Sequence, residues 1–271
     1  MIKDITLGQY IPGESFVHKL DPRIKIIISM VFIVSLFLVN NFEGYIFVIM
    51  FIAASVIISK VPFKFIYKGL KPVFMLLLFT AVINIFMTSG EGTPLIQWKF
   101  IRIYREGLIL AAFMIIRLTF LIMGTSLLTL TTSPIELTDG IEKLLRPFRK
   151  IGVPAHELAM MMTIALRFIP TLMDETDKIM KAQMARGADF ESGNLFARAK
   201  NLIPLLVPLF ISSFRRADEL AMAMEARCYR GGEGRTRMKV LKLKNRDFTA
   251  ATVTTLYVVL CIFSRGWWKP V

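Results

Sequence analysis

Cysteine and histidine are scarce in this 271-residue chain, which contains two of each. Cys228 and Cys261 are too few for a disulfide framework, and Cys261 lies within an apolar segment. His18 and His156 add too few ligands for a metal site of the His/Cys type. We therefore expect neither a disulfide scaffold nor a metal centre.

The motifs of nucleotide binding and of hydrolytic chemistry are also missing. No G-x-x-x-x-G-K-[ST] loop, H-E-x-x-H helix or G-x-S-x-G turn occurs in the chain. The glycine-rich segment 231–236 has neither the spacing of a phosphate loop nor a strand before it, and is typical of a flexible loop. An acidic cluster at 174–177 leaves an integral-membrane transferase open as an alternative, although no second acidic cluster faces it. We therefore predict a protein with no cofactor that is not itself an enzyme.

Acidic residues are outnumbered by basic ones, 20 Asp and Glu against 34 Lys and Arg, which gives a net charge of +14. Hydrophobic residues make up 55% of the chain, too many for an ordinary soluble domain. This combination indicates a membrane protein with a large surface at the anionic cytoplasmic leaflet. The basic and aromatic stripe of nucleic-acid binders is absent, so we expect no nucleic-acid partner. The first twenty residues are mixed and polar, so we expect no signal peptide.

Apolar runs predict about five membrane-spanning helices, at residues 24–39, 45–59, 72–88, 108–130 and 248–264. The first two are shorter than the ~20 residues of a perpendicular span. The connector after the second run holds four lysines and no acid, which places it in the cytoplasm. From a cytoplasmic N-terminus, five spans put the C-terminus outside, where Trp267-Trp268-Lys269 is typical of an interfacial anchor.

Arg117 lies inside the fourth run, where a charge is costly and usually faces protein or water. We favour a structural interpretation, with an ion pair or hydrogen bonds to backbone carbonyls in the bundle, over a role in transport.

The segment 131–247 has a different character, with 20 Lys and Arg against 14 Asp and Glu, a net charge of +6 that places it in the cytoplasm. Ser133-Pro134-Ile135-Glu136 is a capping box that predicts a helix start. Two long helices follow within 153–232, and each begins apolar and finishes charged. The second holds the apolar stretch 202–214, which two prolines interrupt and which is too short for a span.

These features predict an all-α integral membrane protein with about five transmembrane helices plus cytoplasmic coupling helices. We divide the chain into an N-terminal arm with four spans (1–130), a cytoplasmic coupling-helix module (131–247) and a last span with its tail (248–271).

The two long helices share one ending. The first ends in Ala185-Arg186-Gly187 and the second in Ala226-Arg227-Cys228, and a shift of 227 − 186 = 41 residues superposes five matching positions. Ile179, Ala182 and Arg186 lie at i, i+3 and i+7, on one face of a helix. The simplest explanation for two matching helix endings in one chain is a two-fold symmetric partner that offers two equivalent pockets. The alternative is that each arginine only complements the helix dipole.

These paired endings resemble the twin Ala-Arg-Gly motifs of the transmembrane T component of energy-coupling factor transporters. Further segments resemble that family: YIPGES at 10–15, LDPR at 20–23, ALRFIPT at 165–171 and GGEGRT at 231–236. The resemblance runs over essentially the whole chain.

The resemblance implies a shared, vitamin-type subunit of a micronutrient importer in the bacterial cell membrane. In that family two cytoplasmic helices cross, and their ends sit in grooves on two ABC-type ATPases, which assigns residues 185–187 and 226–228 to those contacts. The membrane side of the same helices holds a substrate-binding S component, which Met160, Met161, Met162 and Leu206 would face.

Cys228 departs from the family pattern, because glycine usually stands there. Because glycine usually takes the left-handed position that ends a helix, this departure weakens the argument for a helix cap at residue 228. We therefore expect the chain to reverse direction at Gly231-Gly232. The permease of a conventional ABC importer stays an alternative, although such a permease usually presents one coupling helix per subunit.

Overall fold

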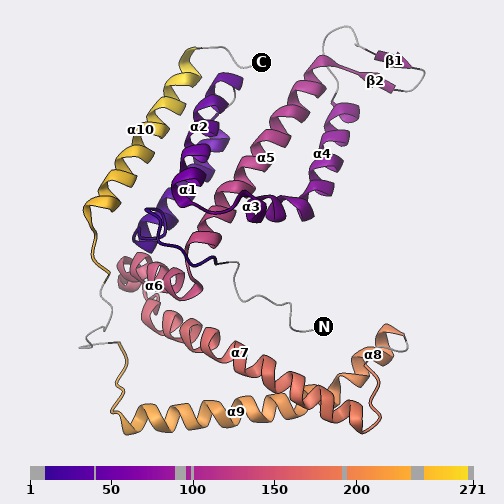
Figure 1. The fold of residues 1–271 in the computed structure, drawn as a ribbon, viewed down its shortest axis with the longest axis vertical. Coiled ribbons are helices and arrows are strands. Elements are labelled where there is room, and N and C mark those ends of the chain that lie inside the picture. Colours follow the sequence, from indigo (N-terminus) through magenta and orange to yellow (C-terminus); the bar gives the residue numbers. More distant parts are fainter. Residues whose placement is uncertain are drawn as a thin grey trace. The chain divides into compact units, whose positions relative to one another are not determined.

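The computed structural model describes residues 10–39, 41–88, 96–98, 101–190, 194–232 and 241–267, nearly all of them helical (Figure 1). The chain divides into two compact units, residues 8–140 with 240–271 and residues 1–7 with 141–239. We call the first the bundle unit and the second the crossing unit.

The bundle unit is built from long apolar helices. Its elements are α1 (Pro22–Leu38), α2 (Phe42–Ser59), α3 (Phe63–Leu70), the 3-10 turn η2 (Lys71–Val73), α4 (Phe74–Met87), β1 (Ile96–Trp98), β2 (Ile101–Ile103), α5 (Arg105–Thr131) and α10 (Asn245–Trp267). The two short strands pair antiparallel and were not predicted from the sequence. The helix α6 (Pro134–Leu145) continues the chain towards the crossing unit.

Local capping explains where two of these helices begin. The Asp21 side chain accepts a hydrogen bond from the Arg23 backbone N–H at 3.0 Å, and Pro22 occupies the first helical position of α1. The Ser133 hydroxyl accepts from the Glu136 backbone N–H at 3.3 Å, so the predicted helix start at Ser133 is confirmed.

Among the described residues, four helical segments are long and apolar enough to cross a membrane, namely Phe42–Ser59, Phe63–Met87, Arg105–Thr131 and Asn245–Ser264. The fifth predicted span is α1, which at 17 residues is shorter and packs against α5 and α10. Of the predicted interfacial anchor, Trp268 and Lys269 lie outside the described residues. The prediction of an all-α membrane protein is confirmed.

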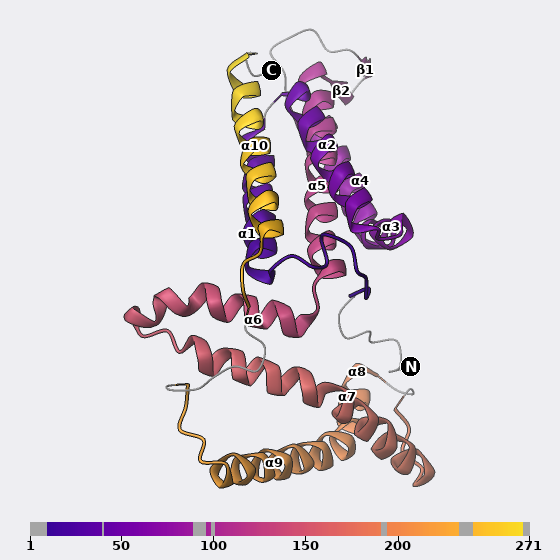
Figure 2. The ribbon, with the colours of Figure 1, turned by 60° about the vertical axis from the view of Figure 1, so that its left-hand side comes forward.

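The core of the bundle unit joins α1, α2 and α10, and α10 packs against both of the other helices; Figure 2 shows α10 running along α1. Phe32, Phe51 and Tyr257 pack together there, with ring centroids 4.4 to 6.2 Å apart. The buried Ser35 hydroxyl hydrogen-bonds the Tyr257 hydroxyl at 2.8 Å. Packing among aromatic rings therefore joins the last helix of the chain, α10, to the two consecutive helices α1 and α2.

Arg117 is held by the corner between α1 and α2. Its guanidinium donates to the Val39 carbonyl oxygen at 3.2 Å and to the Tyr45 hydroxyl at 3.3 Å. It also lies over the Phe37 ring, 5.6 Å from the centroid. The structural interpretation of Arg117 is confirmed, since the cation bonds a carbonyl at the C-terminal end of α1, where a positive charge is favourable.

A buried polar cluster ties the N-terminal arm to three helices of the bundle unit. The Lys25 ammonium donates to the carbonyl oxygens of His18 at 3.0 Å and Thr131 at 2.9 Å. The Asp247 carboxylate accepts from the Asp21 backbone N–H at 2.8 Å. The ends of α1, α5 and α10 are therefore joined by charge-assisted hydrogen bonds.

The crossing unit consists mainly of two long helices, as predicted. Its elements are η3 (Arg146–Ile151), α7 (Ala155–Ala185), α8 (Leu195–Asn201) and α9 (Ile203–Ala226). Pro170 and Pro208 lie inside α7 and α9. The short α8 was not predicted.

Candidate functional site

The two predicted motifs lie at the C-terminal ends of α7 and α9. The last helical residues are Ala185 and Ala226, which are 41 positions apart, like the motifs themselves. Arg186 and Arg227 are the C-cap residues and have nearly the same backbone angles, φ −88° and ψ 6° against φ −94° and ψ 13°. The repeat read from the sequence is therefore a repeat in backbone structure.

Hydrogen bonds at the two ends match one for one. At the first end, the N–H of Ala188 bonds the Gln183 carbonyl and that of Gly187 bonds the Met184 carbonyl, both at 3.0 Å. These are the two bonds of a Schellman motif.

The second end has the same two bonds, shifted by 41 residues. The N–H of Tyr229 bonds the Met224 carbonyl at 3.0 Å, and that of Cys228 bonds the Glu225 carbonyl at 2.8 Å. Both helices therefore stop in the same way and present the same loop of backbone next to an arginine.

The backbone conformation of Cys228 differs from the one expected from the sequence. We expected the missing glycine to leave the chain reversal to Gly231-Gly232, but Cys228 itself adopts φ +54°, close to the left-handed position that Gly187 takes at φ +86°. The hydrogen-bond pattern of the cap thus overrides the usual preference for glycine. A side chain in this conformation costs roughly 1–2 kcal/mol.

Replacing Cys228 with glycine is expected to remove this strain and to stabilise the second end by about 1 kcal/mol. Amide hydrogen exchange of the peptide 222–230, followed by mass spectrometry in the purified protein, should slow by about fivefold. Cys228→Ala keeps the Cβ atom and serves as the control. Equal protection in both variants would show that the thiol, and not the backbone strain, limits this end.

Both ends are open to a partner. The side chains of Arg186 and Arg227 are exposed, and neither has an ion-pair partner among the described residues. Equivalent positions on the arginine-bearing faces of the two helices have the same burial. Ile179 and Leu220 are half-buried, and Ala182 and Ala223 are exposed. The crossing unit therefore presents two similar, exposed surfaces, each with one guanidinium.

An ion pair links the two helices at equivalent positions. Arg216 of α9 donates to the Glu175 carboxylate of α7 at 2.8 Å, and the two residues are separated by the same 41 positions. Equivalent residues of two helices related by a two-fold axis can touch only on that axis. The pair therefore marks an approximate two-fold axis at the crossing of α7 and α9.

The crossing is equidistant from both arginines. Arg186 lies eleven positions after Glu175, and Arg227 lies eleven positions after Arg216. At 1.5 Å per residue, each arm reaches about 16 Å beyond the crossing. Figures 1 and 2 show the C-terminal ends of α7 and α9, which Arg186 and Arg227 cap, on opposite sides of this crossing.

Glu175 is also the acidic residue that the transferase alternative would use. A hydrogen bond from Ser212, followed by the bond and charge of Arg216, lowers the pKa of its carboxyl below the ordinary value. Glu175 therefore has a structural partner. Sequence reasoning missed this pair, although the 41-residue shift superposes Glu175 on Arg216 and could have revealed it.

Charge reversal at the crossing is expected to loosen it. Glu175→Arg and Arg216→Glu each place like charges in contact, whereas the double variant restores an opposite pair. Spin labels at positions 181 and 222, which are exposed and equivalent, report the spread between the two arms. We expect broader distance distributions in the single variants and recovery in the double variant.

Arg215→Glu is the matched control for the crossing, because the neighbouring Arg215 is exposed and forms no ion pair within the described part of the chain. A broadening of equal size in this control, or no recovery in the double variant, would contradict the pivot role of the pair.

The predicted membrane-side residues lie in the apolar halves of α7 and α9. Met161, Met162 and Leu206 are exposed by 54%, 45% and 44%, and Met160 is half-buried. Several neighbours on α9 are also exposed and apolar, including Ile203, Val207, Phe210, Ile211 and Phe214. This is a large apolar surface on a helix that is not among the four candidate spans.

Comparisons with known proteins agree along the whole chain. Residues 13–238 match the CbiQ family, described as cobalt transport protein. The chain is 74% identical to the energy-coupling factor transporter transmembrane protein EcfT of Clostridium kluyveri, with 99% of each chain covered. It is 59% identical to the protein of that name from Thermosediminibacter oceani and 50% identical to that of Bacillus subtilis, each covering 98% of this chain and 100% of the relative.

Proposed function

The chain belongs to the family of energy-coupling factor transporter transmembrane proteins, and from this premise we propose how it works. It transmits ATP-driven movement of two ATPase subunits to a substrate-binding S component, and so drives uptake of a micronutrient of the vitamin type. The observation that carries the proposal is the pair of exposed arginine ends, matched bond for bond and symmetric about the Glu175–Arg216 pair.

Two ATPase subunits are the partners that suit this symmetry. A two-fold symmetric pair of subunits offers the same pocket twice, and a single chain can fill both pockets only if it carries the same structure twice. Residues 185–187 and 226–228 supply that structure. Arginine suits such a pocket because its fork-shaped, permanent cation pairs well with a carboxylate.

The S component would occupy the apolar surface around Met160, Met161, Met162 and Leu206. Methionine side chains are flexible and polarisable, and they adapt to more than one partner surface. This property supports a subunit that serves several exchangeable S components.

In this proposal the ATPases and this subunit have different roles. The chain has no phosphate-binding loop, so the ATPases supply the nucleotide chemistry and this subunit is not itself catalytic. The excess of positive charge in 131–247 supports a cytoplasmic position for this coupling module and for the N-terminus, between four spans in 1–130 and a last span in 248–271.

Purification of the tagged chain from its native membrane tests the proposal. We expect two ABC-type ATPases and small membrane proteins to co-purify with it. The chain freed of these ATPases should neither bind nor hydrolyse ATP. Turnover by rigorously ATPase-free protein, or the absence of ATPases from the complex, would overturn the coupling role.

A further inference from the structure

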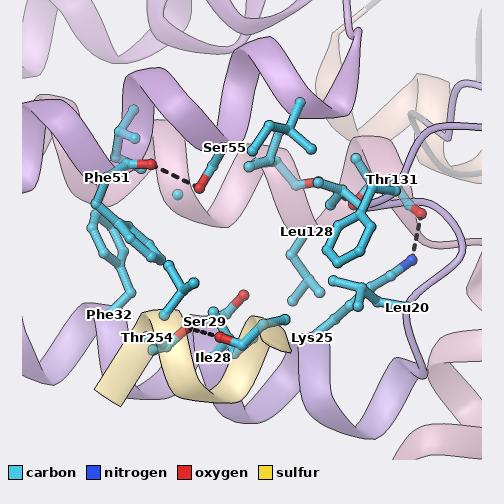
Figure 3. A pocket seen from close by; sticks show the side chains of 18 of the residues that line it. Leu20, Lys25, Ile28, Ser29, Phe32, Phe51, Ser55, Leu128, Thr131 and Thr254 are labelled. Atoms are coloured by element: carbon cyan, nitrogen blue, oxygen red, sulfur yellow. Dashed lines mark hydrogen bonds between the residues drawn. The ribbon is translucent and has the colours of Figure 1, made fainter. Parts of the chain in front are cut away.

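The bundle unit has a partly open cavity of about 500 Å³ between α1, α2, α5, α10 and the N-terminal arm. Figure 3 shows Phe32 and Phe51 at one end of this cavity and Lys25 with Thr131 at the other. Protein interiors rarely hold voids larger than a water molecule, whereas ligand sites commonly have volumes of ~300–1,000 Å³. The cavity therefore has the size of a binding site.

Most of the lining is hydrocarbon, and four of its five hydroxyl groups, all but that of Ser29, donate a hydrogen bond within their own helices. Ser55 donates to the Phe51 carbonyl at 2.8 Å, and Thr254 donates to the Ala250 carbonyl at 2.9 Å. Thr131 likewise donates to a carbonyl of its own helix, at 2.7 Å. Four of the five lining hydroxyl groups are thus satisfied within their helices, so the described lining offers few partners to water or to a polar solute.

The buried charge at one end is compensated as well. Two N–H groups of Lys25 bond carbonyl oxygens, and the carboxylates of Asp21, Asp247 and Glu136 act on it electrostatically. A further anion beside Lys25 would be repelled by these three acids. The chemistry of the cavity thus favours an uncharged hydrocarbon segment over a carboxylate such as a free fatty acid.

We propose that this cavity binds one acyl chain of a membrane phospholipid. Three of its four helical walls, α2, α5 and α10, include segments long and apolar enough to span the membrane, so phospholipid chains surround them. The aromatic end formed by Phe32 and Phe51 receives the tip of the chain, and the headgroup stays outside the cavity. This site is independent of the arginine ends and does not rest on the proposed coupling role.

The test uses the full chain with its co-purifying partners in vesicles of phosphatidylglycerol and phosphatidylethanolamine. A trace of phosphatidylglycerol carries a photoreactive diazirine near the end of one acyl chain. Ile52 and Leu127 line the cavity and are only 3% and 9% exposed. We expect mass spectrometry to find cross-links at these two positions as well as at the exposed Phe79 of α4.

Ala250→Phe should fill the cavity and abolish the cross-links at Ile52 and Leu127 while Phe79 is still labelled. The matched control, Ala251→Phe, changes the next residue of α10, which does not line the cavity, and should keep all cross-links. Ser55→Phe fills the cavity from α2 and replaces Ala250→Phe if that variant does not insert.

Three results would overturn the proposal. One is labelling of Phe79 without labelling of Ile52 or Leu127 in the wild-type protein. Another is unchanged labelling of these two residues in a filled variant. The third is labelling by diazirine-bearing palmitic acid but not by the phospholipid, which would assign the cavity to free fatty acids.

Discussion

Replacing both Arg186 and Arg227 with glutamate is expected to abolish uptake and association with the ATPases, while membrane insertion is retained. Each arginine would pair with a carboxylate in an ATPase groove. Removing one partner of a buried ion pair costs about 3–5 kcal/mol, and roughly 1.4 kcal/mol is a tenfold change in affinity. A single variant should therefore weaken the two-point attachment severely, and the double variant should lose it.

Co-purification and uptake at normal expression measure this effect. Lysine at both positions should rescue only in part, because it lacks the bidentate fork of arginine. The control is Arg198→Glu with Arg215→Glu, which makes the same change in net charge at two other exposed positions. If the arginines only complement helix dipoles, the loss would be about 0.3–1 kcal/mol and lysine would rescue well. Assembly and transport by the double glutamate variant would remove the main support for the coupling role.

Leu206→Asp is expected to disrupt capture of the S component while leaving ATPase binding largely intact. Leu206 lies on the exposed apolar half of α9, away from the arginine end of the same helix. A carboxylate buried against an apolar partner without a counter-charge is strongly unfavourable. Co-purification of each partner from membranes distinguishes the two effects.

Two further variants control for Leu206→Asp. Leu206→Met keeps an apolar side chain and should retain the S component. Ala217→Asp adds the same charge at an exposed position in the polar half of α9 and should leave S-component capture unchanged. Loss of ATPase binding with the S component still captured would mean that the two faces of these helices are assigned the wrong way round.

Sequence alone determined the features of this protein that depend on neighbouring residues. Apolar runs predicted the long helices because a membrane span needs only its own length and hydropathy. Ser133 predicted a helix start, since a cap bonds a backbone N–H only three residues away. The matched endings at Ala185 and Ala226 were visible for the same reason, because a helix end is a local structure.

Tertiary structure alone decided which distant groups meet. Lys25 bonds the carbonyl of Thr131 across 106 residues, a contact that no local pattern encodes. The 41-residue shift makes Glu175 and Arg216 equivalent in sequence, but only the crossing of α7 and α9 brings them into contact. Cys228 takes a left-handed conformation because the two cap hydrogen bonds outweigh the preference of its side chain. The hydrocarbon-lined cavity likewise exists only where four helices and the N-terminal arm converge, since its volume is set by the packing between them.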